Sequence, residues 1–152
     1  MAFRTSIKDI MLKKFFNGIL ALFATGSVSA QAEPVKVLFI GNSYTHMNNM
    51  PKMFEKISKD AGMNVIVEKC AQSGASFKVH SEREEVYEAI KSRDWDYVIL
   101  QGYSRELTFD PEHIDTATVP YLNKITTSIY DNYACTNVLF YISFALVTFF
   151  ES

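Results

Sequence analysis

The residues with the clearest chemical potential are Gly41-Asn42-Ser43, which directly follow the apolar run Val37 to Ile40. This pattern predicts a buried strand that ends in a tight turn and lifts the Ser43 hydroxyl out of a sheet. Open α/β sheets bind ligands at the carboxyl ends of their strands. A hydroxyl held there can attack an electrophile if a neighbouring group takes its proton. Asn and Ser also often follow strands simply because their side chains bond to the local backbone of a turn. Ser43 can therefore be interpreted as a nucleophile or as a turn residue.

Two further loops rich in small residues follow later apolar runs. The second is Gln72-Ser73-Gly74-Ala75-Ser76, and the third is Gln101-Gly102-Tyr103-Ser104. In a parallel sheet these loops converge on one edge. Hydrolysis by a serine also needs donors aimed at the developing oxyanion. The predicted donors are the backbone N–H groups of Ser43 and Gly74 and the side-chain amide of Gln101.

A base for Ser43 is harder to find. His46 lies three residues beyond Ser43 and is expected on the same loop. His113 ends the stretch Asp110-Pro111-Glu112-His113, in which Asp110 is interpreted as a helix N-cap before Pro111. His80 is interpreted as a surface residue ahead of a helix cap. Neither His46 nor His113 is strongly indicated as the base.

Strands alternate with helices along the chain, which predicts βαβ units and a parallel sheet. Ser81 is expected to cap the middle helix, with Glu84 completing a capping box. Pro120 is expected to bend or split the last helix. The predicted strands are 35–40, 64–68, 96–101 and 137–142, and the predicted helices are 51–60, 81–93 and 111–130.

Residues 1–30 are predicted to be a secretory signal peptide, cleaved near Ala30 or Ala32. Four basic residues precede the apolar stretch 15–24, and small residues follow it. That stretch is too short for a membrane span of about 20 residues; the alternative is a buried helix. We therefore expect a periplasmic or secreted protein that meets a membrane only through this segment.

Charge and composition exclude several functions. Removing residues 1–30 takes away four basic residues and one acidic residue, so the net charge falls from −2 to −5. A mildly acidic chain without a basic patch is a poor binder of nucleic acid. No Cys/His cluster has metal-ligand spacing, and no dinucleotide or Walker glycine loop is present. Cys70 and Cys135 are expected at opposite edges of the sheet and therefore unpaired. We expect no metal and no cofactor.

The three loops, in order, resemble the SGNH (GDSL-type) hydrolases, and most closely a divergent exported bacterial branch. The likeness covers about Val35 to Val138. It implies a three-layer α/β/α fold with a parallel, flavodoxin-like sheet, and hydrolysis of lipid or carbohydrate esters. Ser43 then falls on the nucleophile and Gly74 on the oxyanion glycine. Asn42 replaces the usual Asp of the first block; the Asn of the third block is missing, and Gln101 is the candidate substitute.

The family's fourth block, an Asp-x-x-His near its carboxyl end, has no counterpart at that position. Residues 138–150 are instead nearly all apolar. We therefore interpret residues 35–152 as the amino-terminal part of an SGNH-like domain with an incomplete sheet. The preferred function is an exported ester hydrolase that acts on small-molecule carbohydrate or lipid esters and can be inactive in this truncated form. The alternatives are a non-catalytic remnant or ligand-binding domain and, ranked last, a flavodoxin-like phosphate or cofactor binder.

Overall fold

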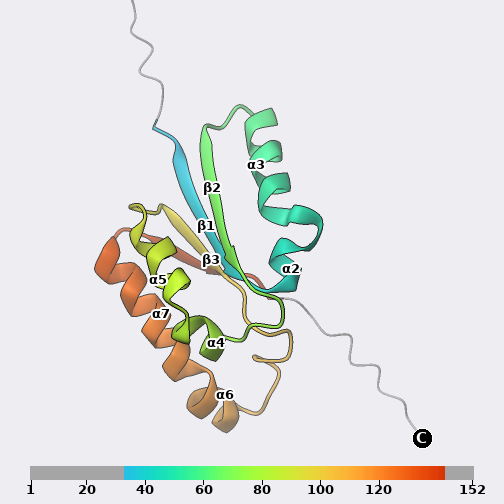
Figure 1. The fold of residues 1–152 in the computed structure, drawn as a ribbon, viewed down its shortest axis with the longest axis vertical. Coiled ribbons are helices and arrows are strands. Elements are labelled where there is room, and N and C mark those ends of the chain that lie inside the picture. The colour runs from blue at the N-terminus through green and yellow to red at the C-terminus, as the bar shows by residue number, and fades with distance from the viewer. Residues whose placement is uncertain (1–32, 143–152) are drawn as a thin grey trace, which may run out of the picture. The chain divides into compact units, whose positions relative to one another are not determined.

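The computed structural model describes residues 33–142, and these form one four-stranded, all-parallel sheet (Figure 1). The strand order is β2-β1-β3-β4. The first strand is central because its apolar residues, Val37 to Ile40, are buried on both faces. The strands are β1 (Val35–Gly41), β2 (Val65–Ala71), β3 (Tyr97–Leu100) and β4 (Asn137–Phe140). The predicted α/β class is confirmed.

Helices connect the strands, and three of the described helices begin at a side-chain cap, at Asn42, Ser76 and Asp110. Asp110 caps α6 as expected, since its carboxylate accepts the N–H of His113 at 3.0 Å. The break between α6 and α7 falls at Thr118, two residues before Pro120, so the predicted split is confirmed. The helical elements are α2 (Ser43–His46), the 3₁₀ turn η1 (Met47–Asn49), α3 (Met50–Asp60), α4 (Phe77–Glu82), α5 (Glu84–Lys91), α6 (Pro111–Ala117) and α7 (Val119–Asn132).

The prediction of one helix over 81–93 is wrong. Ser76 caps α4, since its hydroxyl accepts the N–H of Val79 at 3.3 Å. Ser81 lies inside α4, where its hydroxyl donates to the carbonyl of Lys78 at 2.8 Å. The chain then breaks at Arg83, whose backbone is extended, and α5 begins at Glu84. The Ser–Glu spacing resembled a capping box, but the buried side chains of α4 set the true start of the helix.

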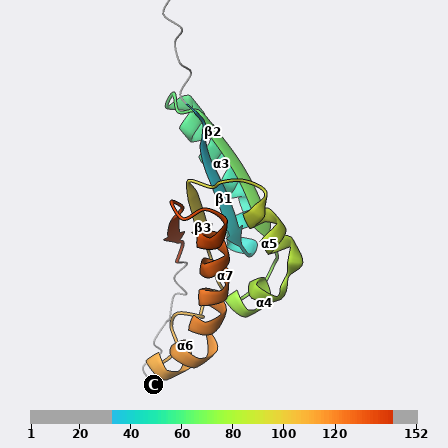
Figure 2. The same ribbon diagram turned by 90° about the vertical axis from the view of Figure 1, so that its left-hand side faces the viewer.

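Two helical layers lie against the sheet, on opposite faces. Figure 1 shows α3 on one side and α4, α5 and α7 on the other, and Figure 2 shows α6 below α7, beyond the sheet. The main core lies under α4, α5 and α7. Its buried members are Leu38, Ile40, Cys70, Phe77, Val86, Ile90, Trp95, Val98, Leu100, Ile125 and Ile129.

The face toward α3 is only partly covered within the described residues. Phe39 packs edge-on against Phe54 of α3, with ring centroids 5.7 Å apart. By strand register, Tyr97 and Leu139 share this face with Phe39. They are 38% and 48% exposed, and Ile57 of α3 is 65% exposed. These apolar side chains are thus exposed within residues 33–142. The expected incompleteness of the sheet stays a prediction, because the apolar run from residue 143 lies outside the described residues.

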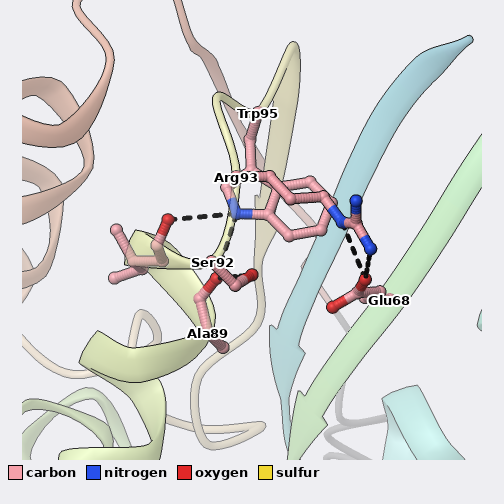
Figure 3. A network of polar contacts seen from close by, with 6 residues as sticks. Glu68, Ala89, Ser92, Arg93 and Trp95 are labelled. Carbon is pink, nitrogen blue, oxygen red and sulfur yellow. Dashed lines mark hydrogen bonds and ion pairs between the residues drawn. The ribbon is translucent and has the colours of Figure 1, made fainter.

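A polar network ties the end of α5 to the sheet (Figure 3). The indole N–H of Trp95 donates to the carbonyls of Ala89 and Ile90 at 3.0 and 3.1 Å. Arg93 lies over the Trp95 ring and forms an ion pair with Glu68 of β2 at 2.8 Å. Because the buried indole N–H is satisfied, Trp95 can fill the core without an unpaired donor.

The remaining structural predictions concern the cysteines and the predicted leader. Cys70 is buried in β2, Cys135 is exposed just before β4, and both are free thiols, as predicted. The predicted signal peptide lies outside the described residues. Within 33–142 no helix is long and apolar enough to cross a bilayer.

Candidate active site

Asn42 joins the three loops at the carboxyl edge of the sheet. Its side-chain N–H₂ group donates to the carbonyl of Ala75 at 3.2 Å and to that of Gly102 at 2.8 Å. Its side-chain oxygen accepts the N–H of Tyr44 at 3.1 Å and so caps α2. The residue is 2% exposed. The predicted convergence of the loops is confirmed, and one amide holds it.

Ser43 is the first residue of α2, directly beyond this junction. Its side chain is half-buried, and its hydroxyl makes no hydrogen bond to any residue in the described range 33–142. Its backbone N–H precedes the capped turn and also has no partner in that range, as is usual for the first N–H groups of a helix. The hydroxyl is therefore free to act, but no base is bonded to it.

Gln101 has a role that the sequence did not predict. Its side-chain oxygen accepts the N–H of Asn42 at 3.0 Å and the hydroxyl of Thr45 at 2.9 Å. Its N–H₂ group donates to the carbonyl of Gly102 at 2.6 Å. With the side chain only 1% exposed, Gln101 braces the turn around Ser43. Donation from this amide to an oxyanion stays a prediction.

The second loop places a left-handed glycine at the edge. Gly74 has a φ of +72°, which residues with a Cβ rarely adopt. The N–H of Ala75 closes the turn onto the carbonyl of Gln72 at 3.1 Å. The N–H of Gly74 has no hydrogen-bond partner among residues 33–142. It is therefore available as the oxyanion donor that we predicted.

One histidine is hydrogen-bonded to a serine at this edge, and the serine is not Ser43. The Nε2 atom of His46, at the end of α2, lies 2.8 Å from the Oγ of Ser73 in the second loop. His46 is half-buried and Ser73 is exposed. We did not predict this pair, because the two residues are 27 positions apart and only the folded loops bring them together.

Glu106 fixes the third loop from within. Its carboxylate accepts the N–H of Phe77, the first residue of α4, and the N–H of Tyr103 at 2.8 Å. Burial raises the pKa of Glu106 above its ordinary value, although hydrogen bonds from Tyr103 and Phe77 oppose that shift. A Cβ on Gly102 would overlap the Glu106 carboxylate and lie 2.6 Å from the Phe77 ring. Only glycine fits there, a constraint that the sequence alone did not show.

The other two histidines lie away from this junction. His80 is fully buried within α4, so the prediction of a surface residue is wrong. Burial, aided by the nearby positive charge of Arg83, lowers the pKa of His80 to about 4. Its two ring nitrogens have no hydrogen-bond partner in the described structure. His113 is exposed on α6 and packs against Phe109, with ring centroids 4.4 Å apart.

A small apolar cavity of about 220 Å³ opens beside the third loop. Its walls include Phe77, Leu100, Gly102, Tyr103, Leu107 and Phe140. Gly102 belongs both to this wall and to the junction at Asn42, while Ser43 and Gly74 do not line the cavity. Among residues 33–142, no group of three or more His, Cys, Asp or Glu side chains could hold a metal ion.

Comparison with solved structures defines the class of fold: the four parallel strands and their helices form an SGNH-hydrolase-type fold. The chain is similar to AlinE4, an SGNH-hydrolase family esterase, with a TM-score of 0.55 and 15% identity over 73% of this chain. It is also similar to TesA, with a TM-score of 0.53 and 13% identity over 69%. No family model matches the sequence, and no curated protein matches it.

A third similar structure is the periplasmic domain of a lipopolysaccharide acetyltransferase from Salmonella ser. Paratyphi A, with a TM-score of 0.53 and 13% identity over 71% of this chain. The chain spans 58% of TesA, 60% of AlinE4 and 44% of this domain. The predicted resemblance to the SGNH fold is thus confirmed at the level of architecture.

Proposed function

We propose that this protein is an exported serine ester hydrolase of SGNH type with Ser43 as its nucleophile. One observation carries the proposal: Asn42 ties three loops together around the free hydroxyl of Ser43. The unpartnered N–H groups of Ser43 and Gly74 lie on the loops that Asn42 joins. An SGNH-type fold, shared with an esterase, supports the same chemistry.

The proposed reaction follows from these groups. The Ser43 oxygen attacks the ester carbonyl carbon while its proton passes to a base, and the N–H donors stabilise the resulting oxyanion. The bond to the alcohol oxygen then breaks, and the alcohol leaves with a proton. Water, activated in the same way, attacks the acyl-enzyme and releases the acid. His46, three residues beyond Ser43 in α2, is one candidate base in the described part of the chain.

The substrate class is proposed from the cavity. Ligand pockets for drug-sized molecules measure about 300–1,000 Å³, so 220 Å³ of mostly apolar space favours a short acyl group. We propose small-molecule carbohydrate or lipid esters with short acyl chains.

The test is hydrolysis of p-nitrophenyl acetate and p-nitrophenyl octanoate by the purified chain. We expect acetate to be preferred, and Ser43→Ala to lower turnover by about 10⁴- to 10⁶-fold, as loss of a triad member does in serine proteases. Ser92→Ala, an exposed serine at the end of α5, is the matched control. Activity that survives Ser43→Ala would refute Ser43 as the nucleophile.

A non-catalytic ligand-binding domain is the second candidate. It is favoured by the absence of any hydrogen bond between Ser43 and a base within 33–142. It predicts saturable binding of short-chain esters or sugars, seen by calorimetry, without product formation. Export is tested separately: cells that express residues 1–152 should yield a periplasmic or secreted form that mass spectrometry shows to begin after Ala30 or Ala32.

A further inference from the structure

We propose that Ser73 and His46 form a second nucleophilic pair, which accepts an acyl group from activated carboxylic esters. The observation is the contact of 2.8 Å between the Ser73 hydroxyl and Nε2 of His46. Serine hydroxyls are activated by a base within hydrogen-bond reach, about 2.6–3.2 Å. Ser43 makes no such contact in the described structure.

The surroundings of Ser73 suit this chemistry. Ser73 is exposed, so an ester can reach it without a conformational change. It precedes Gly74, whose unpartnered N–H lies one residue away in the same turn and can donate to an oxyanion. His46 is anchored on α2, and α2 is held by its cap at Asn42. Both members of the pair are thus positioned by the junction of the three loops.

The proposed step balances as follows. With the imidazole proton on Nδ1, Nε2 accepts the Ser73 hydroxyl proton while Oγ bonds to the ester carbonyl carbon. The ester bond then breaks, and the leaving alkoxide takes the proton from Nε2. The products are acyl-Ser73, the free alcohol and neutral His46. A water molecule can then attack the acyl carbon while Nε2 accepts its proton. The bond to Oγ of Ser73 breaks, the proton passes from Nε2 to that oxygen, and the acid leaves.

The pair lacks a third group in the described structure, since Nδ1 of His46 has no hydrogen-bond partner among residues 33–142. In a serine protease, loss of the productive triad arrangement by changing the orienting carboxylate costs about 10⁴ in turnover. The pair should therefore show itself as slow, stoichiometric acylation. The inference does not require Ser43 to react, so it stands apart from the proposed function.

The first experiment labels the whole chain with a fluorophosphonate and maps the modified serine. Trypsin separates the candidates, because Ser43 lies in the peptide 37–52 and Ser73 in the peptide 70–78. We expect label on Ser73 in the wild type and in Ser43→Ala. We expect none in Ser73→Ala, and labelling about 100-fold slower in His46→Gln.

The outcomes distinguish the two proposals. Label on Ser43 alone supports the proposed function and overturns this inference. Label on Ser73 alone supports the inference and counts against Ser43. Equal labelling of Ser73 in wild type and His46→Gln, or no label on either serine, overturns the inference.

A second measurement avoids the phosphonate. Ser73→Cys places a thiol beside His46, and its alkylation by iodoacetamide is followed with and without His46→Gln. Cys135 is an exposed free thiol in the same molecule and serves as the internal reference. We expect the thiol at position 73 to react at least about tenfold faster than Cys135, and the advantage to vanish with His46→Gln. Equal rates at the two thiols would overturn the inference.

Discussion

Replacing Asn42 with aspartate tests the junction of the three loops most directly. The side-chain N–H₂ group of Asn42 gives two hydrogen bonds to the carbonyls of Ala75 and Gly102. An ionised carboxylate of the same shape can still cap α2 but cannot donate. It would face two carbonyl oxygens at a position that is 2% exposed.

The expected loss of stability can be worked from these contacts. Two lost hydrogen bonds amount to about 2 kcal/mol. Burial of an unpaired charge adds to this, since removing one partner of a buried pair costs about 3–5 kcal/mol. We expect Asn42→Asp to lower the free energy of unfolding by about 5–7 kcal/mol at pH 7, a large share of the roughly 5–15 kcal/mol of a typical domain.

The loss should also depend on pH. The buried position raises the pKa of the introduced carboxyl above its unfolded value of about 3.9. The part of the penalty that comes from the charge is therefore absent below about pH 3.9, where the carboxyl is protonated in both states. It grows as pH rises from there to the folded pKa and is complete above it. Asn42→Ala, which has no charge, should lose about 3 kcal/mol with no such pH dependence.

The assay is urea unfolding followed by the fluorescence of Trp95, the sole tryptophan and a buried one. Asn137→Asp, at the exposed asparagine that begins β4, is the matched control and should change stability by less than about 1 kcal/mol. If Asn42→Asp were as stable as the wild type at pH 7, the junction would not depend on the two donated bonds.

Three further predictions concern buried groups. The pKa of His80 is lowered from 6.5 to about 4, so between these pH values the unfolded chain takes up a proton and the folded chain does not. The free energy of unfolding of the wild type, measured in urea, should therefore fall by up to about 3 kcal/mol from pH 6.5 to pH 4, and that of His80→Leu by much less. Gly102→Ala should cost about 1–3 kcal/mol because its Cβ overlaps the Phe77 ring, and an unchanged melting temperature would contradict this. Glu106→Gln should cost about 2 kcal/mol at pH 7, since one acceptor oxygen replaces two and the N–H₂ group would face the backbone N–H of Phe77 or Tyr103; calorimetry measures it, and Glu112→Gln on exposed α6 is the control.

The fold was largely predictable from the sequence because its signals are local. The apolar run from Val37 to Ile40 is long enough to mark a central strand, and Pro111 and Pro120 mark helix boundaries without knowledge of the partners. The start of α4 was missed because two serines, Ser76 and Ser81, could each cap a helix. The burial of His80 decides which of the two serines is the cap, and that burial depends on the residues that pack over His80.

The candidate site was predictable only in part. Its place, at the carboxyl edge and on three loops, follows from the topology of a parallel sheet. Its contacts do not, because Asn42, Gln101 and Glu106 bond across separations in sequence that no local pattern encodes. The contact of His46 with Ser73 is another that joins residues far apart in the sequence. Sequence spacing directed attention to Ser43, three residues from His46, and missed a partner on another loop.

The two outer strands of the sheet differ in charge. β2 carries Glu68 and Lys69, and the latter is exposed. β4 carries no charged residue between Asn137 and Phe140. Charged side chains on an outer strand discourage main-chain pairing with a further strand, and their absence permits it. Within the described residues, a further strand would therefore pair more readily with β4 than with β2.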